Sequence, residues 1–296
     1  MRAVETVVKI GLKNILYLTD FSRSAEFAFG AAQGLARKFD ARMIVAHVLE
    51  PAEYQFVPQQ GVVETTVGVE ESAKKELLQL EKRITGIPHE LLLSKGEVWD
   101  AVTELVRKNK ADLLVMGTHG RTGLRRLLMG SVAERVFRQA HCPVITVGPR
   151  AAGNESRELK IKRVLFATDF GAESQAALGY ALSIAEEFLA ELTMVHVERV
   201  PLEPLDSPAV LVTEGEKAMA AMIPEEATSW CKPEYKVRFG DPAKQILKVA
   251  EEVHADLIVL GAKASNLHPA IATHVIMATA HKVVCDAECP VLSVRG

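Results

Sequence analysis

The stretch from Gly117 to Ser131 carries residue types that could hold a phosphate group. A strand-like run ends at Met116, glycines stand at 117 and 120, nine residues follow, and Gly130–Ser131 opens the next predicted helix. Glycine lets the backbone pass close to a ligand. The free N–H groups and the dipole at a helix start favour a negative group by about 0.3–1 kcal/mol at an exposed site. The spacing therefore predicts a phosphate cradle of bare main-chain amides between residues 117 and 131, to which Ser131 adds a hydroxyl donor.

An acidic residue, Asp20, follows the first predicted strand. In an open α/β sheet the carboxyl ends of the first and fourth strands lie side by side where ligands bind, so Asp20 would face the same crevice as the glycines. Two alternatives remain open. Asp20 and Ser22 precede a predicted helix and could simply cap it, and the glycines could only shape the loop.

The other reactive residue types give weaker signals. His47 and His196 recur at the end of the second strand of each half, where a backbone carbonyl is their expected partner. No pair of histidines has the spacing of a zinc site. Cys285 and Cys289 lie four apart, but Cys289 heads a strand and both are better explained as buried thiols, so we expect no metal site built by the protein alone. Three loop arginines could hold phosphate oxygens or face solvent: Arg121, Arg125 and Arg126.

Short apolar runs alternate with helical patterns and position these residues. Periodicity predicts five strands in the first half, at 14–18, 43–48, 90–93, 112–116 and 143–147. Helices are predicted between them at 24–39, 70–84, 97–108 and 131–139, with a loop from 51 to about 68. The second half repeats the order, with strands at 163–167, 193–197, 235–238, 256–260 and 291–294. The expected fold class is α/β, with two tandem doubly wound five-stranded parallel sheets of the Rossmann-like type.

The chain contains the same unit twice. Residues 13–48 align without a gap on residues 162–197, and the identical positions include Lys13, Leu16, Thr19, Asp20, Phe21, Gly30, Phe39, His47 and Val48. The repeat predicts a domain at 1–149, a polar linker at 150–160 and a second domain at 161–296. Cys142–Pro143 and Cys289–Pro290 open the last strand of each half, where proline is tolerated at a strand start or edge. We therefore expect those strands at sheet edges, available for pairing.

Composition excludes several classes of protein. The 296 residues carry a formal net charge of −3, which provides no general attraction to nucleic acid or to an anionic membrane. No run of about 18 apolar residues occurs, so no membrane span is expected. Four irregularly spaced cysteines, and a charged beginning without the apolar core of a signal peptide, indicate a reducing cytoplasm.

Several short motifs stand at fixed places in the chain: TDFS at 19–22, HV at 47–48, MGTHG at 116–120, the nine-residue spacer, Gly130–Ser131 and the closing CPVITV at 142–147. Together they resemble the universal stress protein family in its tandem two-domain form. The resemblance covers almost the whole chain, and the glycine spacing of the first half is that of the family's ATP-binding members. It implies the adenine nucleotide alpha-hydrolase-like variant of the Rossmann-like fold and a cytoplasmic, nucleotide-dependent sensor or regulator of the stress response.

Carried over residue by residue, the resemblance implies an ATP site in the first half, with Mg²⁺ as the accompanying ion. Thr19 and Asp20 would flank the nucleotide, with Asp20 near the ribose or a phosphate-bound Mg²⁺, and the backbone of Val48 would meet adenine. The ribose and phosphates would be lined by Met116, Gly117, His119 and Gly120, and the triphosphate would be covered by Gly130, Ser131 and Val132. Family members typically pair through their last strands, which the two halves could do with each other as a pseudo-dimer. A homodimer through edge strands stays open.

The second half departs from this pattern at the phosphate loop. Thr168, Asp169, Val197 and Gly261 match, but Ala264 stands at the second glycine position. Met277 and Ala278 stand where Gly130 and Ser131 should be, in a loop that is three residues longer. Because β carbons there would crowd a phosphate, we predict that this half does not bind ATP in the same manner and serves as a partner or regulatory domain.

Motifs of other nucleotide-binding classes do not occur. The P-loop string GxxxxGK[ST] and the dehydrogenase string GxGxxG are both missing from the sequence, and no constellation of acid, nucleophile and base is visible. The sequence therefore favours a nucleotide-binding sensor over an enzyme, with slow ATP hydrolysis at most. The main alternative is an interaction module of the same fold that binds no nucleotide and uses its sheet edge and long loops.

Overall fold

The chain forms two compact units. The computed structural model describes residues 10–50, 66–119, 129–151, 160–199, 208–262 and 278–295. The first unit begins at Leu12, and the second begins at Lys160 and also includes Ile10 and Gly11. The Ile10 N–H donates a hydrogen bond to the Ser183 hydroxyl of the second unit at 2.9 Å.

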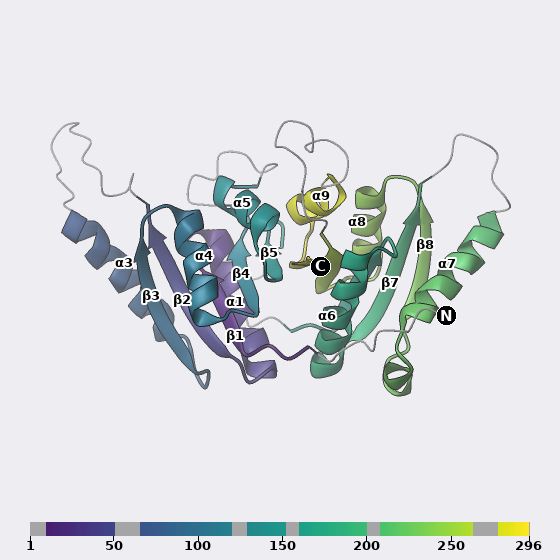
Figure 1. The fold of residues 1–296 in the computed structure, drawn as a ribbon, viewed down its shortest axis with the longest axis horizontal. Coiled ribbons are helices and arrows are strands. Elements are labelled where there is room, and N and C mark those ends of the chain that lie inside the picture. The colour runs from purple at the N-terminus through teal and green to yellow at the C-terminus, as the bar shows by residue number, and fades with distance from the viewer. Residues whose placement is uncertain are drawn as a thin grey trace. The chain divides into compact units, whose positions relative to one another are not determined.

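The first unit is a five-stranded parallel sheet with the strand order β3-β2-β1-β4-β5 (Figure 1). Its elements are β1 (Asn14–Leu18), α1 (Arg23–Lys38), β2 (Arg42–Leu49), α3 (Thr66–Glu81), β3 (His89–Lys95), α4 (Val98–Asn109), β4 (Leu113–Gly117), α5 (Ser131–Gln139) and β5 (Val144–Val147). The chain winds outward from β1 to β3 and then crosses back to β4. Right-handed crossovers therefore put α1 and α3 on one face and α4 and α5 on the other, with the ligand crevice at the ends of β1 and β4.

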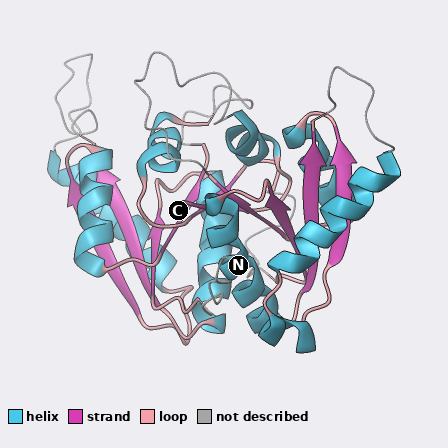
Figure 2. Cartoon of the chain, turned by 45° about the vertical axis from the view of Figure 1, so that its right-hand side comes forward, coloured by secondary structure: helices cyan, strands magenta, loops and turns pink. Residues whose placement is uncertain are grey.

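The second unit has the same topology, with the strand order β8-β7-β6-β9-β10. Its elements are β6 (Arg163–Thr168), α6 (Ala172–Phe188), β7 (Glu191–Glu198), α7 (Pro208–Met222), a 3-10 helix (Glu225–Ser229), β8 (Glu234–Phe239), α8 (Pro242–Glu252), β9 (Leu257–Gly261), α9 (Ala278–Asp286) and β10 (Val291–Val294). Figure 2 shows the alternation of helices and strands in both halves. The predicted α/β fold class, with two tandem doubly wound parallel domains, is confirmed.

The predicted elements occur in the predicted order, and β1, α5 and β10 have the predicted bounds. The largest shift is in α3, predicted at 70–84 and observed at Thr66–Glu81. The helix ends early because the chain leaves it in tight turns, in which the N–H groups of Arg83 and Ile84 donate to the carbonyls three residues earlier. The strand predicted at 90–93 extends over His89–Lys95, since it pairs with β2 along that whole length. The rest of the loop predicted from residue 51 onward lies outside the described residues.

A carboxylate joins the amino ends of the two central strands in each unit. The Asp112 carboxylate accepts hydrogen bonds from the N–H groups of Lys13 and Asn14, both at 2.8 Å. In the second unit the Asp256 carboxylate does the same for Lys162 and Arg163, at 2.8 and 2.9 Å. The repeat therefore extends to the contacts that fix the central strands at the end of the sheet opposite the crevice.

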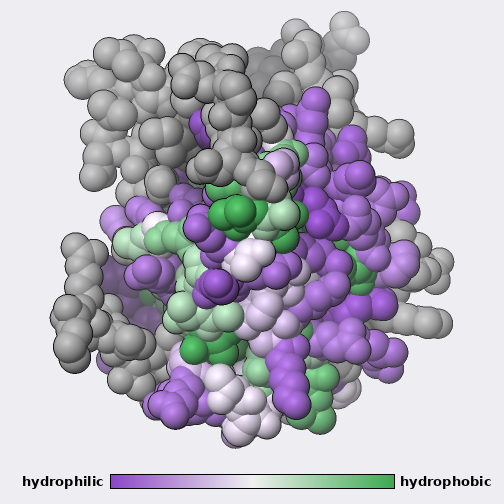
Figure 3. Space-filling model, turned by 90° about the vertical axis from the view of Figure 1, so that its right-hand side faces the viewer, coloured by the Kyte–Doolittle hydropathy of each residue, from purple (hydrophilic) through white to green (hydrophobic). Residues whose placement is uncertain are grey.

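Each sheet is buried beneath its helices, as expected for a parallel sheet. Four of the five residues of β1 and four of the five of β4 are buried. The face of the second unit in Figure 3 is mainly hydrophilic, and hydrophobic side chains form separate patches on it. Among the described helices, none is both long enough and apolar enough to cross a membrane.

Candidate functional site

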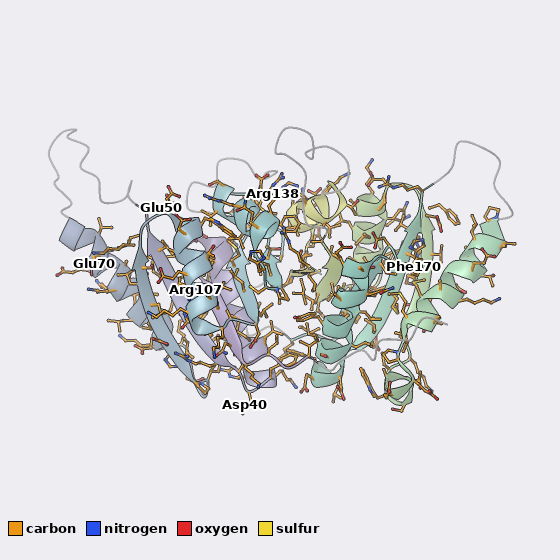
Figure 4. All side chains as sticks on the ribbon, viewed as in Figure 1. Asp40, Glu50, Glu70, Arg107, Arg138 and Phe170 are labelled. Atoms are coloured by element: carbon orange, nitrogen blue, oxygen red, sulfur yellow. The ribbon has the colours of Figure 1, made fainter. Side chains whose placement is uncertain are left out.

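A cavity of about 390 Å³ opens at the carboxyl ends of β1, β2 and β4 in the first unit, bounded by α4 and α5. This volume lies within the range of small-molecule sites. Figure 4 shows Glu50, which lines the cavity, at this end of the sheet, and Asp40 at the other end. Nine of the ten predicted site residues line the cavity: Thr19, Asp20, Val48, Met116, Gly117, His119, Gly130, Ser131 and Val132. The tenth, Gly120, lies outside the described residues, as do the three loop arginines.

The amino end of α5 supplies donors for an anion. Gly130 is the N-cap residue, with φ −62° and ψ 151°, and has no side chain with which to cap the helix. The N–H groups of Ser131, Val132 and Ala133 have no acceptor within the helix, and all three residues line the cavity. Together with the helix dipole, these amides form a site for a negative group.

Fewer amides are bare than the sequence predicts. The Thr118 N–H donates to the Val147 carbonyl at 3.0 Å, and the Gly130 N–H donates to the Thr118 carbonyl at 2.8 Å. These bonds continue the pairing of β4 with β5 and tie the two ends of the loop together. The prediction of bare amides between 117 and 131 is therefore wrong at Thr118 and Gly130, while the amides of residues 120–128 lie outside the described part of the chain.

Helix α1, in contrast, is capped by the protein itself. The Ser22 hydroxyl accepts a hydrogen bond from the Ala25 N–H at 3.2 Å. Asp20 Oδ1 accepts the Ser22 N–H at 3.0 Å, which forms the side-chain turn that precedes the helix. Ser22 is thus the N-cap, and Asp20 fixes the turn while it also lines the cavity.

Gly117 allows the start of α1 to pack against the end of β4. A β carbon at this position would lie 2.7 Å from the backbone nitrogen of Ala25 and from the carbonyl carbon of Ser24, so the backbone would have to shift. The close packing lets two hydroxyl groups donate to the His119 carbonyl, Ser24 at 2.7 Å and Ser22 at 3.1 Å. Gly117 therefore packs against α1 and also lines the cavity in which the sequence predicts a ligand.

Contacts among residues in and next to the cavity lining hold the end of β1 in place. His47 Nδ1 lies 2.7 Å from the Thr19 carbonyl oxygen, and the rings of His47 and Phe21 have centroids 4.5 Å apart. Phe21 has φ 61°, an uncommon conformation for a large side chain, which turns the chain toward α1. The Tyr17 hydroxyl donates to the Ala25 carbonyl at 2.7 Å, and burial raises the pKa of Tyr17, so this donor stays protonated.

Helix α4 supplies an apolar wall that was not predicted from the sequence. Val98 and Val102 lie one turn apart on α4, and together with Leu18 and Val48 they line one side of the cavity. An apolar wall suits the flat face of a nucleobase, whereas the donors of α5 suit phosphate. The spacing of the two valines is visible in the sequence, but the same spacing occurs on any helix that faces a core.

The second unit repeats the supporting contacts of the first. His196 Nδ1 lies 2.9 Å from the Thr168 carbonyl oxygen, and Phe170, labelled in Figure 4, has φ 60°. Gly261 also packs against a helix, because a β carbon there would lie 2.5 Å from the carbonyl carbon of Glu173. The scaffold of a crevice is therefore present in both units.

The three hydroxyl groups that contact His119 in the first unit are not repeated in the second. Gly171, Glu173 and Ala262 stand at the positions of Ser22, Ser24 and Thr118. Helix α9 begins at Ala278, the position of Ser131 in α5. The other two predicted departures, Ala264 and Met277, lie outside the described residues.

Within the described residues, no group of three or more His, Cys, Asp or Glu side chains could hold a metal ion.

Burial raises the pKa of the Cys142 and Cys231 thiols to about 11 and that of Cys289 to about 12. These thiols therefore stay protonated at neutral pH and are weak nucleophiles.

The fold and the cavity define a class of protein. It has two doubly wound parallel α/β domains in tandem, and the first has a cavity at its topological switch point, with an apolar wall and an open helix start. The model of the universal stress protein family matches residues 11–148 and again residues 160–295. The chain therefore belongs to the universal stress protein family.

Two relatives found by sequence each match about half of the chain, and one solved structure matches almost all of it. Universal stress protein MJ0531 of Methanocaldococcus jannaschii is 36% identical over 138 residues, which cover 46% of this chain and 81% of the relative. A universal stress protein of Thermus aquaticus is 34% identical over 143 residues, which cover 46% and 98%. The crystal structure of a universal stress protein from Archaeoglobus fulgidus matches 95% of this chain and 98% of its own, with a TM-score of 0.69 and 21% identity. At that identity the likeness shows the fold alone.

Proposed function

We propose that the first domain binds ATP together with Mg²⁺ and that the protein is a nucleotide-dependent sensor or regulator in the stress response. The observation that carries the proposal is the open amino end of α5. Its N–H groups at Ser131, Val132 and Ala133 belong to the same cavity as the Asp20 carboxylate and His119. An uncapped helix start inside a cavity is a site for phosphate.

The two sides of the cavity suit the two parts of an adenine nucleotide. The triphosphate would meet the donors of α5, and adenine would lie between Val48 and the α4 wall of Val98 and Val102. The Asp20 carboxylate would repel a bare triphosphate. A Mg²⁺ ion held by one carboxylate and the phosphates of the ligand is a common arrangement that removes this repulsion.

Binding without rapid turnover suits a sensor. Among the described residues, the lining of the cavity includes no lysine or arginine that could clamp a transferring phosphoryl group. We therefore propose slow hydrolysis at most, and a role for ATP as a bound signal.

Pairing of the two domains through their last strands, as a pseudo-dimer in the cytoplasm, is part of the same proposal. Its support is that β5 and β10 each end the strand order of their own unit. Sedimentation of the full chain separates this arrangement from a homodimer, since a single chain sediments with the mass of one chain and a homodimer with the mass of two.

Calorimetric titration of the full-length protein with ATP and Mg²⁺ is expected to saturate near one nucleotide per chain. The physical reason is that the second half has Met277 and Ala278 at the positions of Gly130 and Ser131, where side chains would crowd a phosphate. Two equivalent tight sites would contradict this assignment. No heat and no thermal shift at millimolar ATP would instead favour an interaction module that binds no nucleotide.

A further inference from the structure

Thr118 and His119 form a pair at the end of β4, beside the donors of α5. The Thr118 side chain is fully buried, and its hydroxyl oxygen lies 2.8 Å from His119 Nδ1 and 3.4 Å from the Val147 carbonyl oxygen. His119 lines the cavity. Its Nε2 atom is buried and has no hydrogen-bond partner among the described residues.

These distances determine which ring nitrogen of His119 carries the proton. A threonine hydroxyl has a single hydrogen to donate. If it donates to Nδ1, the proton of the neutral ring sits on Nε2; if it donates to the Val147 carbonyl, the ring proton sits on Nδ1 and Nε2 becomes an acceptor.

The contact with the ring is the better hydrogen bond. Hydroxyl hydrogen bonds to oxygen are normally about 2.5–3.0 Å long, and the 3.4 Å contact with Val147 exceeds that range. The same carbonyl already accepts the Thr118 N–H at 3.0 Å. The hydroxyl of Thr118 therefore donates to Nδ1, and Nε2 carries the ring proton.

We propose that Thr118 is a positioning residue that keeps His119 in the tautomer protonated at Nε2. A neutral imidazole then offers a hydrogen-bond donor to an oxygen that can only accept, such as a phosphate oxygen of the ligand. This inference rests on the proposed ATP site and deepens it, because it assigns the chemistry of one contact. The ligand oxygen would satisfy a buried N–H group that the described part of the protein leaves without an acceptor.

Two further observations support the assignment. The backbone of His119 is fixed by the hydroxyls of Ser22 and Ser24, which both donate to its carbonyl, so the ring starts from a defined position. The second half has Ala262 and Lys263 at the positions of Thr118 and His119. The pair therefore occurs only in the half that has Gly130–Ser131 at the start of the helix.

Long-range proton–nitrogen NMR of the full-length protein with isotope-labelled histidines measures the tautomer directly. The spectra are recorded at a pH at which the histidine rings are neutral. The signal that is missing from the spectrum of the His119→Gln variant is assigned to His119. We expect the wild type and Thr118→Ser to show only the pattern of a proton on Nε2, and Thr118→Val to show a mixture of the two tautomers, because no hydroxyl then fixes the proton. A wild-type His119 ring protonated at Nδ1 would overturn the proposal, and so would a Thr118→Val variant with the wild-type pattern. The first result comes from the wild-type protein alone, so it does not depend on whether the variant folds.

Ligand affinity tests the role of the donor. Thr118→Val is expected to bind ATP about three- to tenfold more weakly, which is less than the full loss of a hydrogen bond to a charged group because the ring can still present a proton on Nε2. Thr118→Ser should bind within about twofold of the wild type. Affinity for adenosine, which has no phosphate, should change less than twofold in both variants. Equal ATP affinity of Thr118→Val and the wild type would overturn the positioning role. If the wild-type protein binds no ATP, the proposed function is wrong, and so is the contact between His119 and phosphate. The tautomer of His119 is decided separately, by the NMR pattern alone.

Discussion

Replacing Gly130 with aspartate is expected to weaken ATP binding at least a hundredfold without destabilising the first domain. The φ of −62° and ψ of 151° at Gly130 are open to any residue. Aspartate is a favourable N-cap, so its carboxylate would accept hydrogen bonds from the N–H groups at the start of α5. Those are the donors that we assign to phosphate. Two unit charges about 4 Å apart also repel by about 4 kcal/mol at an effective dielectric constant of about 20, and a hundredfold loss of affinity corresponds to only about 2.7 kcal/mol.

Thermal unfolding with and without ATP and Mg²⁺ measures both parts of this prediction. Gly130→Asp should melt at or slightly above the wild-type temperature without ligand and gain no stability from ATP. Gly130→Asn is the matched control, since it caps the same amides without a charge, and its affinity should fall about tenfold. Should Gly130→Asp keep the full ATP-dependent stabilisation, the phosphate does not bind at the start of α5.

The part of the site around Gly130 could be predicted from the sequence because its function depends on local structure. A helix start leaves its first N–H groups without partners wherever it occurs, so a Gly–Ser pair before an apolar helical pattern already defines the donors. The same holds for β1 and β10, whose buried runs are short, apolar and bounded by polar residues. Their bounds agree with the prediction to the residue.

Contacts between distant segments could not be predicted in this way. The hydroxyl of Ser24 and the carbonyl of His119 are 95 positions apart, and nothing near either residue indicates the other. Val98 and Val102 line the cavity only because α4 crosses the ends of β1 and β2. The loop amides of Thr118 and Gly130 are used by β5 pairing and loop closure, which the spacing of the glycines does not reveal.

Gly117 combines both kinds of information, and replacing it with alanine has the second large expected effect. The added β carbon would lie 2.7 Å from backbone atoms of Ser24 and Ala25, so α1 would have to move away from β4. Overpacking of this kind typically lowers the free energy of unfolding by about 1–3 kcal/mol. Because the move also withdraws the Ser22 and Ser24 hydroxyls from the His119 carbonyl, we expect ATP affinity to fall at least tenfold. Urea denaturation and calorimetric titration measure the two effects separately.

Gly261→Ala is the matched variant in the second domain, since a β carbon there would lie 2.5 Å from backbone atoms of Glu173 and Ser174. It should destabilise its own domain by a similar amount and leave ATP affinity within about twofold of the wild type, because the proposed site lies in the first domain. Gly11→Ala, whose β carbon would meet nothing within 4 Å, should change neither quantity. If Gly117→Ala and Gly261→Ala weaken ATP binding equally, the two domains share the nucleotide, and the assignment of one competent site to the first half is wrong.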